Sequence, residues 1–212
     1  MTRAGDLAPL PPMTTFDVER LTRAEQYKLL AGSVVPRPIA LVTTLGEHGP
    51  NAAPFSFFNV LAADPPMLMF SVGMREASEK DTIRNLRTCP EAVVHLVDEA
   101  NAVKMNLCSA FYPPEVNELE VAGFAVAPSD VVRPPRIVSC PVQFECVVEQ
   151  ITPFGAVPYH LVLVRVLRMH FRSDIVNDKH HVDLTALNPI GRISGPGMYN
   201  RVTDRFHLPS LL

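Results

Sequence analysis

The chain has 212 residues, which is long enough to bury a proper core in one domain with extensions. Apolar residues make up 47% of it and charged residues 19%, as is ordinary for a globular protein. The formal net charge of −3, without a basic stripe, argues against a nucleic-acid-binding surface. Arg165 and Arg168 interrupt the longest apolar run, so no membrane span is expected.

The cysteines and the N-terminus indicate the compartment. Cys89, Cys108, Cys140 and Cys146 have no CxxC spacing and no zinc-like arrangement with histidines, so no metal site is expected. The opening MTRAGDLAPLPP lacks the apolar core of a signal peptide. We therefore expect reduced thiols and a cytoplasmic location.

In chain order, residues 1–15 are expected to form a flexible arm and residues 16–200 one domain, with 201–212 as a tail. Thr22 begins a helix over 22–30, in which Glu25 completes a capping box. Three apolar runs follow, 39–44, 51–59 and 67–72, separated by a glycine turn and by Asp64-Pro65-Pro66. The second run alternates small or polar residues with bulky ones, a period of two that is typical of a strand. Short connections predict an antiparallel meander.

The polar stretch after the third run is the candidate for phosphate binding. The segment from Ser78 to Leu86 has the pattern of a helix start, where free N–H groups and partial positive charge favour an anion. Lys80 adds a full charge, and the Ser78 and Thr82 hydroxyls are neutral donors. The alternative interpretation is a variant capping box between Ser78 and Asp81, with Lys80 solvated.

The second half of the chain adds strands and short helices. His95, in the apolar run 92–97, is interpreted as a core or edge histidine. Short helices are expected within 101–109 and at 114–119. The run 142–149 alternates clearly, with Glu145 among its outward residues, and 159–171 is the last long strand. His180-His181 is assigned to a surface turn, and the glycine-rich stretch 188–197 to coil.

These segments resemble a known family. RPIALVTT, NAAPFSFFN, PPMLMFSV and KDTIRN, in that order and spacing, are similar to the flavin reductase-like proteins with an FMN-binding split barrel. AGFAVAPSDVVRPPRI, CPVQFECVVE and VDLTALNPIGRISGPGMY are similar to its longer, flavoredoxin-like branch. The resemblance runs from about residue 16 to about residue 199.

The resemblance implies a mainly β fold with short helices, an antiparallel split barrel that forms a homodimer and binds FMN near the subunit interface. About six strands with short helices between them fit such a barrel. The family pattern implies two groups of cofactor-binding residues. Those expected to line the flavin are Thr43, Thr44, Asn51, Ala53, Pro54, Ser56, Phe57 and Asn59. Those expected at the ribityl chain and phosphate are Ser71, Val72, Ser78, Lys80, Asp81 and Thr82, with Asp81 the awkward member because it carries negative charge.

The family also has a histidine near the start of its last long strand, and His160 matches it, although Val157-Pro158-Tyr159 departs from the family's preceding residues. If His160 is functional, it acts on hydride transfer; the alternative is a histidine at a strand end that reaches solvent. The resemblance implies an FMN-dependent oxidoreductase that reduces flavin or another small acceptor with NADH or NADPH, with room for a partner oxygenase. A flavoredoxin-like electron carrier and an FMN-binding module without turnover remain alternatives.

Overall fold

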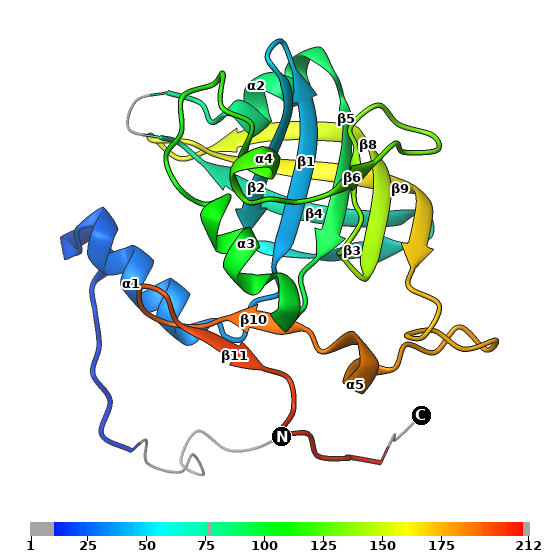
Figure 1. Cartoon of the computed structure of the whole chain (residues 1–212). Helices are drawn as coiled ribbons and strands as arrows, with labels where there is room; N and C mark the ends of the chain where they lie inside the picture. Colours follow the sequence, from blue (N-terminus) through cyan, green and yellow to red (C-terminus); the bar gives the residue numbers. More distant parts are fainter. Residues whose placement is uncertain (1–10, 76–77, 210–212) are drawn as a thin grey trace.

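The computed structural model describes residues 11–75 and 78–209, and shows a barrel of long strands with short helices around it (Figure 1). Its strands are β1 (Ala40–Gly46), β2 (Gly49–Phe55), β3 (Phe58–Ala63), β4 (Pro66–Gly73), β5 (Glu91–Leu96), β6 (Val126–Ala127), β7 (Arg136–Ile137), β8 (Val142–Phe154), β9 (Tyr159–Phe171), β10 (Ile190–Arg192) and β11 (Tyr199–Arg201). Its helices are α1 (Arg23–Ser33), α2 (Asp81–Thr88), α3 (Ala102–Leu107), α4 (Glu118–Val121) and α5 (Leu184–Leu187), with 3-10 turns at Val18–Arg20 and Glu99–Asn101. Residues 1–10 of the expected arm and 210–212 of the expected tail lie outside the described residues.

Seven strands form one antiparallel sheet in the order β2-β1-β5-β8-β9-β4-β3. The predicted run 51–59 is not a single strand, because the chain bends at Ser56-Phe57 and divides it into β2 and β3. The predicted three-strand meander is therefore wrong: β2 pairs with β1, and β3 pairs with β4. At the bend, the Ser71 N–H donates to the Phe57 carbonyl at 2.8 Å, which continues the pairing of β3 with β4 by one residue.

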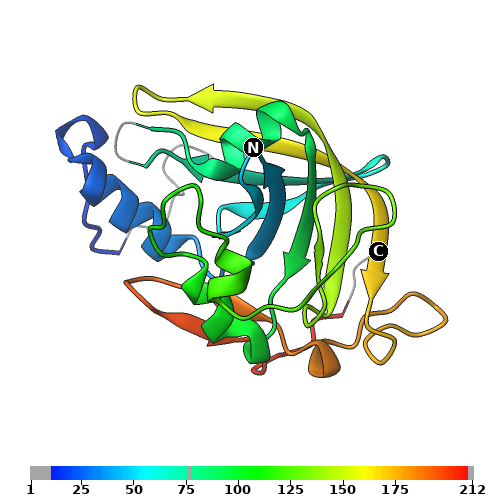
Figure 2. The ribbon, with the colours of Figure 1, turned by 45° about the horizontal axis from the view of Figure 1, so that its top comes forward.

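The interior of the barrel is the main hydrophobic core. Alternate residues of β9, among them Val162 and Val164, point inward with Phe70 of β4, and all three are fully buried. Helix α2 contributes Ile83 and Leu86 to the same core. Turning the barrel brings α2 to the front, across the end of the barrel (Figure 2). Burial of each such side chain contributes on the order of 1.5–3 kcal/mol, so the position of α2 is strongly fixed.

A second core lies outside the barrel, between β1 and β2 and the segment that carries α3 and α4. It includes Leu41, Met105, Leu119 and Ile137. His95 of β5 is completely buried beside it. Its Nδ1 lies 2.9 Å from the Leu41 carbonyl, and its Nε2 lies 2.9 Å from the Ile137 N–H, which must donate. The imidazole is therefore neutral, with its proton on Nδ1, and the interpretation of His95 as a core residue is confirmed.

Three local predictions meet different outcomes. The capping box at the start of α1 is present, with the Thr22 and Glu25 side chains each bonded to the other's backbone N–H. The helix expected at 114–119 begins instead at Glu118, because the Asn117 side chain caps it. The expected coil at 188–197 contains β10, which pairs with β11 in a hairpin whose turn places Gly195 and Gly197 at positive φ.

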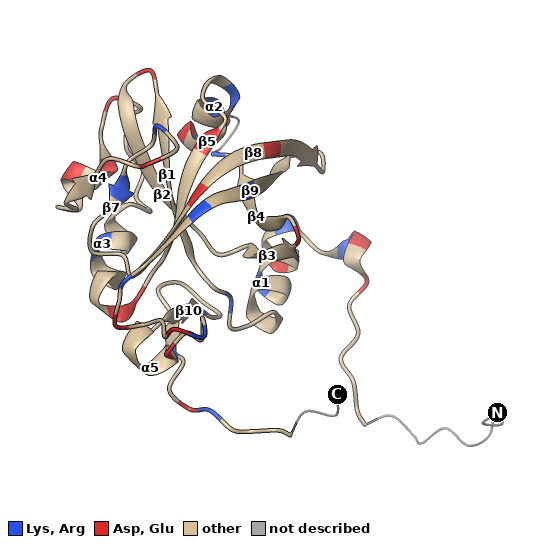
Figure 3. Cartoon of the chain, turned by 90° about the vertical axis from the view of Figure 1, so that its right-hand side faces the viewer, with Lys and Arg blue, Asp and Glu red and all other residues tan. Residues whose placement is uncertain are grey.

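Charged residues lie mostly in helices, loops and strand ends, while the middle of β8 and β9 carries both signs (Figure 3). One of these charged residues is Glu145 of β8. It points outward, as predicted, but it is fully buried. The loop before β8 covers it. Within the part of the chain that the structure describes, no helix is long and apolar enough to cross a membrane.

His95 makes stability depend on pH. Burial lowers the pKa of His95 from 6.5 to about 4. Below pH 6.5 the unfolded chain binds a proton that the folded chain refuses, so the free energy of unfolding should fall as the pH drops toward 4, by on the order of 3 kcal/mol. Urea unfolding of the wild type and of His95→Gln at several pH values measures this: the variant should lose that part of the slope. His207→Gln, at an exposed histidine, is the control, and equal slopes in the wild type and His95→Gln would contradict the assignment.

Candidate functional site

The first turn of α2 meets the open edge of β2, and the two elements enclose a small cavity of about 80 Å³. We call it the Lys80 cavity. It is lined by Asn51, Ala53, Pro54, Arg75, Lys80, Asp81, Thr82, Cys108, Ser109, Ala110 and Glu118. Three separate parts of the chain thus contribute: β2, the start of α2, and the segment that carries α3 and α4.

Lys80 is the N-cap residue of α2, and its side chain makes no capping bond. The capping box that was the alternative to phosphate binding does not form, because the Ser78 hydroxyl donates to the Arg75 carbonyl. Asp81 pairs with Arg84 and lies 3.8 Å from the Arg75 guanidinium. The start of α2 thus has no side-chain cap from Lys80, and its first turn contributes Asp81 and Thr82 to the lining of the cavity.

The electrostatics of the cavity favour negative charge. Lys80 is only partly exposed, and burial together with the charge of Arg75 lowers its pKa. Its ammonium makes no hydrogen bond or ion pair with any residue in the described ranges. Arg75 stacks on Phe111, with the guanidinium 3.7 Å from the ring centroid, and donates to the Tyr112 carbonyl. An anion placed between Lys80 and Arg75 would relieve the repulsion between two partly desolvated cations.

Glu118 forms the floor of the cavity. It is 7% exposed and accepts hydrogen bonds from Asn51 Nδ2 at 2.8 Å and from the Ala52 N–H at 3.2 Å. These bonds fix the amide of Asn51, so that its Oδ1 accepts from the hydroxyls of Thr44 and Thr82 at 3.4 Å each. Burial raises the pKa of Glu118, and the nearby charge of Asp81 acts in the same direction.

Two further hollows lie on either side of Ser56, and we call them the Ser56 hollows. The first, of about 190 Å³, adjoins the Lys80 cavity at Pro54 and Ser109 and also contacts Arg192 and Tyr199. The second, of about 410 Å³, is mostly apolar and is lined on its polar side by Ser56, Asn59 and Ser71. A continuous path of hollows therefore runs along β2 from Lys80 to the bend at Ser56-Phe57.

The predicted residues divide over this path. The structure brings Asn51, Ala53, Pro54, Lys80, Asp81 and Thr82 together at the Lys80 cavity. It brings Ser56, Phe57, Asn59 and Ser71 to the Ser56 hollows, so Ser71 lies away from the other residues expected at the phosphate.

Four predicted residues lie elsewhere, which corrects their expected positions. Thr43 is fully buried on the opposite face of β1, where its hydroxyl donates to the Pro135 carbonyl at 2.7 Å. Val72 points into the barrel core. Thr44 is also buried, and its hydroxyl donates a hydrogen bond to Asn51 Oδ1. Ser78 lies in an exposed turn.

His160 points into the barrel, on the same face of β9 as Val162, as the period of two predicts. It is 3% exposed, and its Nε2 lies 3.1 Å from Glu79 Oε1, while Glu79 also pairs with Arg87. Its neighbour Tyr159 faces the other way and stacks on Phe57 at 6.1 Å between ring centroids. The ring that β9 presents to the Ser56 side is therefore that of Tyr159, and the role of His160 in hydride transfer stays a prediction.

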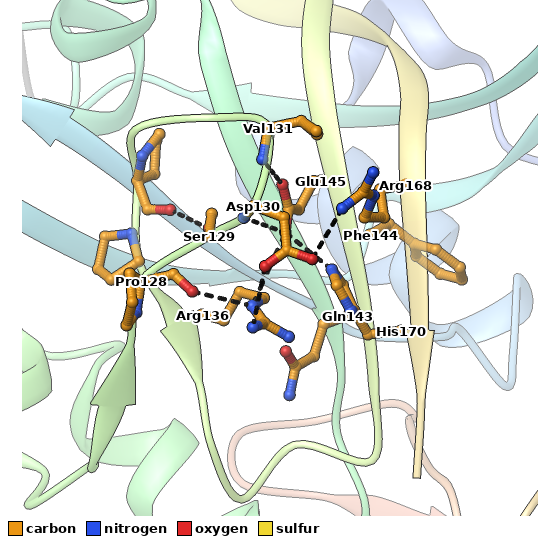
Figure 4. Close-up of polar contacts among 12 residues, drawn as sticks. Pro128, Ser129, Asp130, Val131, Arg136, Gln143, Phe144, Glu145, Arg168 and His170 are labelled. Atoms are coloured by element: carbon orange, nitrogen blue, oxygen red, sulfur yellow. Dashed lines mark hydrogen bonds and ion pairs between the residues drawn. The ribbon is translucent and has the colours of Figure 1, made fainter. Parts of the chain in front are cut away.

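A separate polar cluster lies on the outer face of β8 and β9 (Figure 4). Potential metal ligands of Asp130, Glu145 and His170 lie within 4.8 Å of one another. Arg168 and Arg136 already pair with Asp130, and Glu145 accepts from the N–H groups of Asp130 and Val131. With two guanidinium groups present, the cluster is best explained as the ion-pair network that closes the loop at 128–136 over β8.

Sequence reasoning did not find Glu118, Arg75 or Ser109. Glu118 reaches Asn51 across 67 residues of chain, and no local pattern marks such a contact. Arg75 follows the third apolar run in a polar stretch, so its charge was visible, but its direction depends on the stacking with Phe111.

Comparison with known proteins gives the family and the fold of the chain. A family model described as "Flavin reductase like domain" matches residues 31–190. The structure is similar to nitrilotriacetate monooxygenase component B from Bacillus cereus, with a TM-score of 0.90 and 34% identity over 94% of this chain and 100% of that chain. It is also similar to 2-nitrobenzoate 2-nitroreductase NbaA from Pseudomonas fluorescens, with a TM-score of 0.84 and 37% identity over 94% of this chain and 98% of that chain. A Shewanella frigidimarina protein with a split barrel domain shares the fold at 16% identity, with a TM-score of 0.79 over 91% of this chain and 96% of that chain.

Proposed function

Because the chain belongs to the flavin reductase-like family, whose model matches residues 31–190, we propose that it is an FMN-dependent oxidoreductase. It takes electrons from NADH or NADPH and passes them to a flavin or to another small acceptor. The observation that carries this proposal is the path of hollows along β2, with a partly buried lysine at one end that makes no hydrogen bond or ion pair with a residue of the described ranges.

The residues present fit the phosphate of FMN. Lys80 and Arg75 supply positive charge, and the start of α2 adds the positive end of its dipole, while the Thr82 hydroxyl is bonded to Asn51 Oδ1. Asp81 is neutralised by Arg84 and Arg75 and does not oppose an anion with a free charge. These ion pairs reduce the electrostatic repulsion between the Asp81 carboxylate and a phosphate.

The residues at Ser56 fit a flat ring. Ala53 and Pro54 are small and leave space over β2, and the bend at Ser56-Phe57 frees backbone groups from sheet pairing. When bound, FMN supplies the hydride acceptance and the release of electrons in one or two steps. The chain then holds the phosphate, orients the ring edge and excludes water from its buried face.

The two neighbours above 30% identity support an organic acceptor. One is named a nitroreductase and the other a component of a monooxygenase. We propose that reduced flavin serves either a small acceptor bound at the site or a partner oxygenase. Steady-state consumption of NADH and NADPH, with and without added flavin, distinguishes this function from a flavoredoxin-like carrier and from a module that only binds FMN.

We also propose a homodimer. Leu30 and Val34 line the second Ser56 hollow, Val60 and Leu61 follow Asn59 in β3, and all four expose large apolar side chains. Light scattering of the FMN-bound protein should give twice the mass of one chain, and a stable monomer would contradict the proposal.

The absorbance spectrum of the purified protein tests the proposed function. We expect FMN either to copurify or to bind at micromolar concentration, and its visible absorbance to bleach when NADH or NADPH is added without oxygen. A protein that takes up no FMN would refute the function. A protein that binds FMN but is not reduced by either nucleotide would be a carrier or a binding module.

Lys80 provides a test of the phosphate position. Lys80→Ala should weaken FMN binding by about 1.5–3 kcal/mol, the range for a hydrogen bond to a charged group, and leave riboflavin binding almost unchanged. Fluorescence titration measures both ligands, with Lys179→Ala, at an exposed lysine in a distant turn, as the control. Equal losses for FMN and riboflavin would show that Lys80 does not contact the phosphate.

His160 is tested by separating reduction from binding. If it acts on hydride transfer, His160→Gln should slow the reduction of bound FMN by NADPH or NADH about 10- to 100-fold, or about 1.4–2.7 kcal/mol of barrier. The dissociation constant of FMN should stay near the wild-type value. Stopped-flow reduction of the FMN-saturated variant decides the point, and wild-type rates would make His160 a structural partner of Glu79.

A further inference from the structure

A further hollow lies beside α1, and no part of the proposed function uses it so far. It has a volume of about 930 Å³ and lies between α1, the loop that connects β10 to β11, and the start of β9. Figures 1 and 2 both show α1 and this hairpin at the same end of the barrel. We call it the α1 cleft. The side chains that matter here are Arg23, Tyr27, Lys28, Arg37, Tyr159 and Arg192.

The cleft contains four cationic side chains, and no carboxylate residue lines it. Within the described ranges, none of the four forms an ion pair. Arg37 is 6% exposed and donates to the carbonyls of Ala31 and Val34 and, at 3.4 Å, to the Ser56 hydroxyl, all of them neutral groups. Arg192 donates to the Gly195 carbonyl, which is also neutral. Four cations in one cleft, with no carboxylate among the described residues that line it, favour the binding of an anion.

One carboxylate lies close to this group. Glu25 is near Lys28 on α1, and the charge of Lys28 contributes to lowering the pKa of Glu25. The Glu25 carboxylate is nevertheless held by the hydroxyl and the N–H of Thr22, at 2.6 and 2.8 Å. It completes the cap of α1 and does not line the cleft.

Aromatic rings form one wall of the cleft. Phe57 lies between Tyr27 and Tyr159, with centroid distances of 6.2 and 6.1 Å, and the Arg23 guanidinium lies 5.7 Å from the centroid of Tyr159. Gly73 is required on the other side of Tyr159, because a Cβ there would lie 2.9 Å from the tyrosine ring. The wall offers a flat surface to a heterocycle, beside charges that suit phosphate.

The cleft also opens onto the proposed flavin position. Arg192 lines both the α1 cleft and the first Ser56 hollow, and Arg37 lines both the cleft and the second. A ligand held in the cleft therefore has direct access to Ser56, where the redox-active ring of the cofactor is proposed to lie. The reductant has to reach that ring.

We propose that the α1 cleft binds the phosphate-bearing half of the nicotinamide dinucleotide, and that its four cations select NADPH over NADH. This inference rests on the proposed function, in which a nicotinamide nucleotide is the reductant. The pyrophosphate carries two negative charges, and a phosphate monoester such as the 2′-phosphate adds about 1.5–2 more at pH 7. The four cations of the cleft match that total. An aromatic acid is the competing ligand for a cleft with an aromatic wall, but its carboxylate carries only one negative charge. The volume lies at the upper end of the usual range for small-molecule sites, about 300–1,000 Å³.

Calorimetry with adenosine 2′,5′-bisphosphate tests the cleft without any turnover. The full chain should bind this probe at least about 10-fold more tightly than adenosine 5′-monophosphate. Arg23→Gln and Lys28→Gln, at exposed positions on α1, should each weaken binding of the bisphosphate about 3- to 10-fold, which is below the range for charge-assisted hydrogen bonds because both side chains are solvated. Lys179→Gln is the matched control and should bind as the wild type does. Arg37 is unsuitable for this test, because its guanidinium also joins α1 to the bend at Ser56.

The outcomes separate the cleft from the proposed function. FMN titration of the same preparations reports whether the proposed cofactor site, from the Lys80 cavity to the Ser56 hollows, is occupied. If FMN binds but the bisphosphate does not, or binds no better than the monophosphate, the cleft assignment is overturned and the proposed function stands. If the bisphosphate binds as expected but FMN does not, the proposed function fails and the cleft remains a phosphate site. Binding of benzoate in place of both adenosine phosphates would overturn the assignment in favour of an aromatic acid.

Discussion

The burial of Ile83 and Leu86 in the barrel is the packing constraint on which the site depends. Both side chains are at most 1% exposed and contact the same core as Val162 and Val164. Because residues three apart share a helix face, this packing fixes the rotation of α2 and leaves Lys80 and Thr82 at the edge of β2. The cavity is therefore a consequence of how the end of the barrel is filled.

Close approach of backbone reinforces this position. Asn85 of α2 donates to the Thr44 hydroxyl, and its side chain lies so close over Gly46 that a Cβ at this position would clash with Asn85 Oδ1. Thr44 in turn contacts Asn51, whose amide Glu118 orients. These contacts run from α2 through β1 and β2 to α4, and they hold the Asn51 amide in place at the cavity.

A second constraint is the buried guanidinium of Arg37. It satisfies the Ala31 and Val34 carbonyls near the end of α1 and also reaches Ser56 at the bend of the sheet. A helix that would otherwise lie free of the barrel is thereby joined to the residues proposed to hold the cofactor ring. The proposed reductant and cofactor sites then share Arg37 and Arg192, so binding at one is expected to influence the other through these two side chains.

The sequence by itself determined the elements whose signals are local. The alternating residues of β9 gave its bounds and its inward face, the Thr22 and Glu25 pair gave the start of α1, and the polar stretch at 78–86 gave the start of α2. The tertiary structure decided what depends on contacts between residues far apart in the chain. It divided 51–59 at Ser56 and turned Thr43 away from the site. It also placed Glu118 and Arg75 in the lining of the Lys80 cavity. Period and capping are properties of a few neighbouring residues, whereas at the bend the Phe57 carbonyl accepts a hydrogen bond from the Ser71 N–H of β4, a contact between separate strands. Which of two adjacent residues faces a site, as with Tyr159 and His160, depends on which side of the sheet the rest of the chain covers.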